Sequence, residues 1–170
     1  MSQLLSVHNH LKAQAGVNRL AGHQRRAYEA IVAQWHFPAR LNLCGPAGSG
    51  KTYLGWVVAE FQGASYLADP ENLAETLVTV QPGQAVVMDN AKSDPYVLRQ
   101  VLATLDLYNI RRALIITRTP NANILPPIAL DAPVAEDLEQ VRHNLKDAGY
   151  HSSTLTQHAS LWAIIYSTLF

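Results

Sequence analysis

The stretch "LCGPAGSGKTYLG", residues 43–55, decides the fold, because three glycines fall within six positions and a lysine and a threonine follow. Glycines at 45, 48 and 50 permit tight turns and let backbone N–H groups approach a ligand, since no Cβ atom stands in the way. "ARLNLC" before the loop is typical of a short strand, and "KTYLGWVVAEF" after it has the apolar spacing of a helix. The loop therefore joins a strand to a helix N-terminus, where unpaired N–H groups and the helix dipole favour an anion.

The loop matches the phosphate-binding motif G-x-x-x-x-G-K-[ST] at Gly45, Gly50, Lys51 and Thr52. In this motif the lysine reaches the β- and γ-phosphates of a nucleoside triphosphate, and the hydroxyl of the threonine ligates the Mg²⁺ ion that bridges them. We expect ATP and Mg²⁺ as ligands, since the sequence has no N-K-x-D guanine motif. The residues predicted to contact the nucleotide are Gly45, Pro46, Ala47, Gly48, Ser49, Gly50, Lys51, Thr52 and Tyr53.

A second anchor for the metal follows in "AVVMDN", where an apolar run ends in Asp89. The carboxyl end of such a strand lies at the ligand crevice of a parallel sheet, so we expect Asp89 to hold Mg²⁺ together with Thr52, through a water molecule. The next residue, Asn90, can orient an attacking water but cannot accept its proton. We therefore expect slow hydrolysis, unless another acid such as Asp94 or a partner protein completes the site.

Polar residues also end the run "ALIITRTPN". Thr117 at this strand tip would lie between the first and third strands, near the γ-phosphate, and would report its presence. Arg118 is the alternative sensor, and an ordinary solvated strand end is the alternative to any sensor. The predicted catalytic residues are Lys51, Asp89, Asn90 and Thr117.

The other polar residues predict no further site. Among the seven histidines, His8 and His10 are close in sequence, but two ligands without a neighbouring cysteine or carboxylate do not make a metal site. We expect solvated histidines. The paired arginines at 25–26 and 111–112 are typical of a hydrated surface, with a patch for phosphate or an acidic partner as the alternative.

Strands and helices alternate along the chain, which predicts an α/β fold: a three-layer α/β/α P-loop NTPase with a five-stranded, mainly parallel sheet. Asp69–Pro70 and Asp94–Pro95 are typical helix starts, and Gly149 is typical of a helix end. The predicted strands lie within 39–44, 64–68, 85–88, 111–120 and 126–133, and the predicted helices within 18–36, 51–61, 69–80, 93–109 and 135–150.

The composition describes a chain of about one domain, with 170 residues, which we divide into an N-terminal extension, 1–17, and a P-loop NTPase domain, 18–170. A formal net charge of zero gives no field toward nucleic acid or membrane, so any DNA contact would be indirect or through a local patch. The single Cys44 fits a cytoplasmic protein and is expected to be buried. No secretory signal is present, and the apolar segment 161–170 is about half of the length that spans a bilayer, so we expect a buried strand or helix there and no membrane partner.

Several segments resemble, in order and rough spacing, the AAA+ core of the replication-initiator DnaA group: "NRLA" and "YEAI", "GPAGSGKTYL", "VVMDN" and "LIITRTPNANILPPIALDAPVAEDL". The resemblance covers about residues 18–149. Two features depart from that group, since there is no room between Arg118 and Ile128 for the helix that carries the arginine finger, and the 21 residues after Gly149 are too few for the helical lid. This reduced, lidless architecture also resembles the BrxF-type accessory ATPases of bacteriophage-exclusion (BREX) defence systems.

These features predict an ATP-binding, slowly hydrolysing accessory ATPase or switch in a DNA-transaction or phage-defence complex, which acts through a larger protein partner or self-association. A nucleoside or shikimate-type kinase is the alternative, because such enzymes share the loop and the length. Kinases of this type need an arginine-rich lid, whereas Arg142 is the one arginine after Arg118. A non-hydrolysing binding module is a third alternative, which Asn90 supports.

Overall fold

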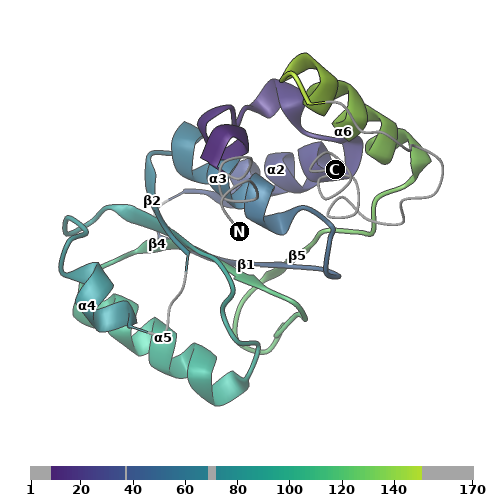
Figure 1. Ribbon diagram of the computed structural model, residues 1–170. Helices are drawn as coiled ribbons and strands as arrows, with labels where there is room; N and C mark the ends of the chain where they lie inside the picture. Colours follow the sequence, from purple (N-terminus) through teal and green to yellow (C-terminus); the bar gives the residue numbers. More distant parts are fainter. Residues whose placement is uncertain (1–8, 37, 69–71, 151–170) are drawn as a thin grey trace.

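The structure confirms the predicted alternation of strands and helices. The computed structural model, shown in Figure 1, describes residues 9–36, 38–68 and 72–150. In chain order the elements are η1 (Val17–Arg19), α2 (Gly22–Gln34), β1 (Ala39–Cys44), α3 (Lys51–Phe61), β2 (Ala64–Leu67), α4 (Leu73–Leu77), β3 (Ala85–Met88), α5 (Pro95–Leu107), β4 (Arg112–Thr117), β5 (Pro127–Ala129) and α6 (Ala135–Asp147).

The strands form one parallel sheet in the order β2-β3-β4-β1-β5. Helices α2, α3 and α6 cover one face of the sheet, and α4 and α5 cover the other (Figure 1). The carboxyl ends of all strands consequently meet at one edge, and β4 lies between β1 and β3 as the strand-tip prediction requires. The predicted three-layer α/β/α fold with a five-stranded sheet is confirmed.

Side chains along β4 alternate between two apolar cores, one on each face of the sheet. Leu114 and Ile116 belong to the core under α2 and α3, whereas Ala113 and Ile115 belong to the core under α4 and α5. All four are at most 1% exposed. Burial on both faces explains why this strand has no polar alternation, as the sequence predicted for the middle of a parallel sheet.

Element boundaries differ from the prediction at two helices. The predicted helix 18–36 is divided, because α2 begins only after Ala21 and a short 3₁₀ turn, η1, precedes it. The predicted helix start at Asp69 and Pro70 lies outside the described residues, and the described helix α4 follows Asn72.

The ends of the domain are described in part. Residues 9–13 are helical, and the Lys12 ammonium lies 5.2 Å from the centre of the Tyr66 ring, so this part of the predicted extension contacts the domain. The predicted apolar element 161–170 lies outside the described residues. Within the described ranges, every helix is too short or too polar to cross a bilayer.

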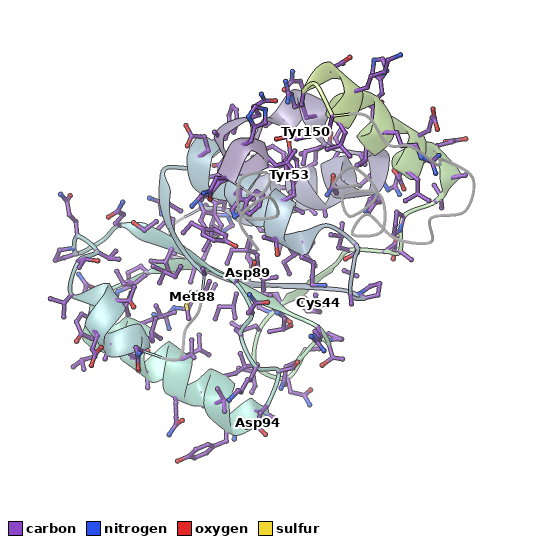
Figure 2. The ribbon with its side chains drawn as sticks, in the orientation of Figure 1. Cys44, Tyr53, Met88, Asp89, Asp94 and Tyr150 are labelled. Carbon is purple, nitrogen blue, oxygen red and sulfur yellow. The ribbon has the colours of Figure 1, made fainter. Side chains whose placement is uncertain are left out.

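The carboxylate of Asp94 caps the start of α5. Its Oδ1 atom accepts hydrogen bonds from the N–H groups of Tyr96 at 2.9 Å and Val97 at 3.0 Å, and Pro95 fills the first helical position. Asp94 is the acid that the sequence offers to complete the site, since Asn90 cannot accept a proton. Figure 2 shows Asp94 at the start of α5, well away from Asp89.

Because Asp94 caps α5, we expect Asp94→Ala to lower the free energy of unfolding by about 1 kcal/mol, within a range of roughly 0.5–2 kcal/mol. Asp94→Asn keeps a side-chain oxygen at the same place and should lose much less. Urea unfolding of the two variants and the wild type measures both changes. Equal stability of Asp94→Ala and the wild type would show that the cap contributes nothing.

Candidate nucleotide-binding site

The phosphate loop connects β1 to α3 at the carboxyl edge of the sheet. Gly48 has φ 76° and Gly50 has φ 85°, which is the left-handed region that side chains with a Cβ rarely adopt. The hydroxyl of Ser49 donates to the carbonyl of Pro46 at 2.9 Å and closes the turn. Pro46 and Ala47 are exposed at the tip of the loop. The residues that the motif singled out therefore form one continuous loop, as predicted.

Gly45 is needed for a reason that the motif does not reveal. A Cβ atom at this position would lie 2.2 Å from the carbonyl oxygen of Leu130, just beyond β5. The chain closes on itself here, since the Leu130 N–H donates to the Cys44 carbonyl at 2.7 Å and the Gly45 N–H donates to the Arg118 carbonyl at 3.3 Å. Cys44 itself is 3% exposed, as expected. The start of the loop is thus fixed between the ends of β4 and β5.

Lys51 lies over the loop that precedes it. Its ammonium donates to the carbonyl oxygens of Gly45 and Pro46, at 2.7 Å each. Burial lowers the pKa of Lys51, and the neighbouring Arg118 acts in the same direction, whereas the carboxylate of Asp89 opposes the shift. The ammonium therefore lies against the loop, and its contact with phosphate stays a prediction.

Thr52 and Asp89 are in direct contact, although 37 positions separate them. The Thr52 hydroxyl donates to Oδ2 of Asp89 at 2.7 Å, and the Asp89 side chain is buried, at 3% exposure for the residue. A hydroxyl and a carboxylate are the hard oxygen donors that suit Mg²⁺, which commonly binds one or two carboxylates together with phosphate oxygens and water. The described residues contain no group of three or more His, Cys, Asp or Glu side chains that would hold a metal by themselves.

Tyr66 is a site residue that sequence reasoning missed. Its hydroxyl donates to the same Oδ2 atom of Asp89, at 2.6 Å. Burial and the adjacent carboxylate raise the pKa of Tyr66 above its ordinary range, so the phenol remains a donor. Gly55 in α3 packs close to the sheet, because a Cβ there would lie 2.7 Å from Ile116 Cδ1. Nothing in "ASYLA" distinguishes this tyrosine from a core residue, since its partner is brought in by the pairing of β2 with β3.

Asn90 adopts a left-handed backbone conformation, with φ 57°. Its N–H donates to Oδ1 of Asp89 at 2.8 Å, and its side-chain amide donates to the carbonyl of Ala68 at 3.3 Å. The amide thus points toward the end of β2 in this conformation. Whether it also orients an attacking water stays a prediction.

Thr117 is buried at the tip of β4, at 2% exposure. Its hydroxyl accepts from the side-chain amide of Asn42 at 2.9 Å and donates to the carbonyl of Thr119 at 2.8 Å. Asn42 is fully buried in β1, and its amide also donates to the Ile115 carbonyl at 2.9 Å. An amide inside the apolar run "ARLNLC" is the signal that could have revealed this second missed residue. The sensor role of Thr117 stays a prediction.

Tyr53, the last predicted nucleotide contact, has its ring in the core. The ring packs edge-on against Trp56, with centroids 6.1 Å apart, and burial raises the pKa of its hydroxyl. A contact of Tyr53 with the nucleotide stays a prediction.

His23 corrects the expectation of solvated histidines, because the residue is only 3% exposed. Its Nε2 atom lies 2.9 Å from the carbonyl oxygen of Ser49, and its Nδ1 atom lies 3.0 Å from Oδ2 of Asp137. Burial opposes ionisation of Asp137, but hydrogen bonds from the N–H groups of Val134 and His23, together with the imidazole, lower the pKa of the carboxyl. The adjacent Gln24 donates from Nε2 to the carbonyl of Gly50 at 3.2 Å. Two side chains at the start of α2 thus contact carbonyl groups of the phosphate loop.

Two solved structures resemble this chain in fold. A RuvB variant from Thermotoga maritima aligns with a TM-score of 0.53 and 15% identity, over 78% of this chain and 54% of RuvB. A replication initiator DnaA bound to AMPPCP and single-stranded DNA aligns with a TM-score of 0.54 and 9% identity, over 85% of this chain and 59% of DnaA. RuvB is described as a Holliday junction branch migration motor. The chain therefore spans a little over half of the length of each protein.

No protein-family model and no curated protein matches the sequence. The likeness to RuvB and DnaA is consequently a likeness of fold. On that evidence, this chain shares the α/β fold of RuvB and DnaA.

Proposed function

We propose that the protein binds ATP with Mg²⁺ and acts as a slowly hydrolysing accessory ATPase or switch in a DNA-transaction complex. The observation that supports this most strongly is the contact between Thr52 and Asp89 beneath a complete phosphate loop. The motif provides the phosphate loop, and the fold brings an acid from a separate strand into contact with it. An ordinary glycine-rich turn would not need such an acid.

Binding a triphosphate would require Lys51 to change partners. Its ammonium now donates to two loop carbonyls, and phosphate oxygens are stronger acceptors, because they carry charge. Thr52 and Asp89 would hold Mg²⁺, which when bound neutralises phosphate charge. Tyr66 would keep Asp89 oriented, since its hydroxyl donates to Oδ2 independently of Thr52.

Slow turnover follows from the residues nearest to Asp89. Asn90 carries an amide in place of an acid, so it cannot accept a proton from water. Asp94, the acid that the sequence offers as a substitute, caps the start of α5 and lies away from Asp89 (Figure 2). A switch that is controlled by binding, and slowly reset by hydrolysis, fits this set of residues better than a rapid hydrolase.

The proposed setting is a complex that acts on DNA. RuvB and DnaA support it, because the first is named as a branch migration motor and the second is bound to single-stranded DNA. The formal net charge of zero argues that a partner protein, or a second copy of this chain, provides most of the DNA contact. A bacteriophage-exclusion (BREX-like) complex in the cytoplasm is the more specific setting that we propose, and the neighbouring genes would test it.

The loop lysine provides the first test. We expect Lys51→Ala to weaken Mg–ATP binding by more than about tenfold, equivalent to about 1.4 kcal/mol, because the triphosphate loses its main counter-charge. Isothermal titration of the wild type and the variant measures the change, with Lys146→Ala as the exposed lysine control. Unchanged affinity in Lys51→Ala would refute the assignment of the site.

Position 90 provides the second test. We expect Asn90→Glu to hydrolyse ATP faster than the wild type, since a carboxylate can accept the proton of the attacking water. Asn90→Gln has a similar size and no carboxylate, so it separates proton acceptance from the cost of a longer side chain in a left-handed conformation. Single-turnover hydrolysis measures both variants. Equal rates for the Glu and Gln variants would mean that position 90 does not face the water.

Turnover by the wild type distinguishes the alternative functions. We expect slow phosphate release with ATP as the sole substrate, since a water can reach the γ-phosphate of an ATPase. A small-molecule kinase would release ADP only when a metabolite acceptor is added, because its closed site excludes water. A non-hydrolysing module would bind ATP and release no phosphate under either condition. A coupled phosphate assay, with and without a panel of nucleosides and shikimate, measures these outcomes.

A further inference from the structure

Side chains from α2 contact two carbonyl groups of the phosphate loop, those of Ser49 and Gly50. Ser49 is fully buried, and its carbonyl oxygen lies 2.9 Å from Nε2 of His23. The next carbonyl, of Gly50, accepts from Nε2 of Gln24 at 3.2 Å. Gln24 is itself oriented, because its Oε1 atom accepts from the Ala21 N–H at 3.0 Å. Two successive peptide groups of the loop therefore have fixed partners on the α2 side.

Fixing these carbonyls also fixes the N–H groups that share their peptide planes. In a trans peptide the C=O and N–H bonds point in opposite directions, so the Gly50 N–H points away from His23 and the Lys51 N–H points away from Gln24. A phosphate is bound by the N–H groups of such a loop. A side chain that holds a carbonyl outward thereby directs an N–H inward.

His23 is in turn held by α6. Its Nδ1 atom lies 3.0 Å from Oδ2 of Asp137, and its backbone N–H donates to Oδ1 of the same carboxylate at 3.1 Å. Asp137 also accepts from the Val134 N–H at 3.1 Å, which ties the carboxylate to the start of α6. His23 and Asp137 are both buried, at 3% and 5% exposure. Figure 1 shows α2, α3 and α6 together on one face of the sheet.

Both ring nitrogens of His23 face an oxygen atom. A carbonyl oxygen only accepts, which assigns a proton to Nε2. The carboxylate of Asp137 faces the other nitrogen, with Oδ2 3.0 Å from Nδ1. Carboxylates that orient a histidine in this way are commonly needed for the histidine to act on its own partner.

We propose that His23 is a positioning residue of the phosphate loop, that Asp137 acts through it, and that this pair couples nucleotide binding to α6. The inference rests on the proposed function, since it assumes that the loop binds a triphosphate. By linkage, a triphosphate that favours the fixed loop also favours the contact of His23 with Asp137, and therefore stabilises α6.

ATP affinities of the wild type and five variants test the positioning role. We expect His23→Ala and Asp137→Ala each to weaken Mg–ATP binding by about 10- to 100-fold, the range seen when a residue that orients a ligand group is lost. The double variant should bind no more weakly than His23→Ala, because Asp137 acts through the histidine. His23→Gln, whose amide can still donate to Ser49, should recover most of the affinity. His143→Ala, an exposed histidine on α6, is the matched control.

Each other outcome overturns a defined part of the inference. Wild-type affinity in His23→Ala, with binding still lost in Lys51→Ala, would overturn the positioning role and leave the proposed function intact. Additive losses in the double variant would show that Asp137 acts separately. No ATP binding by the wild type would overturn the proposed function itself. Thermal unfolding confirms that each variant is folded at the temperature of the titration.

Hydrogen exchange, first of the wild type and then of His23→Gln, tests the coupling. We expect Mg–ATP to slow amide exchange in the phosphate loop and also in α6 (Ala135–Asp147), whereas α5 (Pro95–Leu107), on the opposite face of the sheet, should be unchanged. In His23→Gln the protection of the loop should persist, and that of α6 should be reduced because the contact with Asp137 is altered. Protection of the loop alone in the wild type would overturn the coupling.

Discussion

Parallel pairing of β1 with β4 on one side and β5 on the other fixes the place where the phosphate loop begins. Backbone hydrogen bonds from both neighbours meet at Cys44 and Gly45, and the space left between them excludes even a methyl group at position 45. The loop therefore starts in one defined direction, with α3 following it. The pairing of β1 with β4 also brings Thr117 to the edge at which the loop turns, and the pairing of β3 with β4 brings Asp89 there, because parallel strands end together.

The part of the site that the sequence predicted is the part encoded by local pattern. The motif gives Gly45 to Thr52 as one loop, and an apolar strand ending in an acid gives Asp89. Their meeting could be expected, since the carboxyl ends of parallel strands share an edge, and the structure brings Thr52 and Asp89 into contact. Burial of β4 on both faces followed from its uninterrupted apolar run in the same way.

The residues that the sequence did not reveal act across long separations. His23 and Asp137 are 114 positions apart, and each has an ordinary local context, a polar residue near the start of a helix. Tyr66 meets Asp89 through the pairing of β2 with β3. Such contacts depend on how helices pack against a sheet, which a single sequence encodes only through the whole core.

The two helical layers differ in their contacts with the phosphate loop. Side chains that donate to it come from α2 and from Lys51 at the start of α3, and Asp137 of α6 contacts His23, while α4 and α5 contribute apolar contacts to the opposite core. Exposed positions such as Tyr96 and Leu107 on α5 can therefore change in composition with little effect on the chemistry. The surface on the α4 and α5 side can therefore change during evolution without altering the residues that contact the phosphate loop.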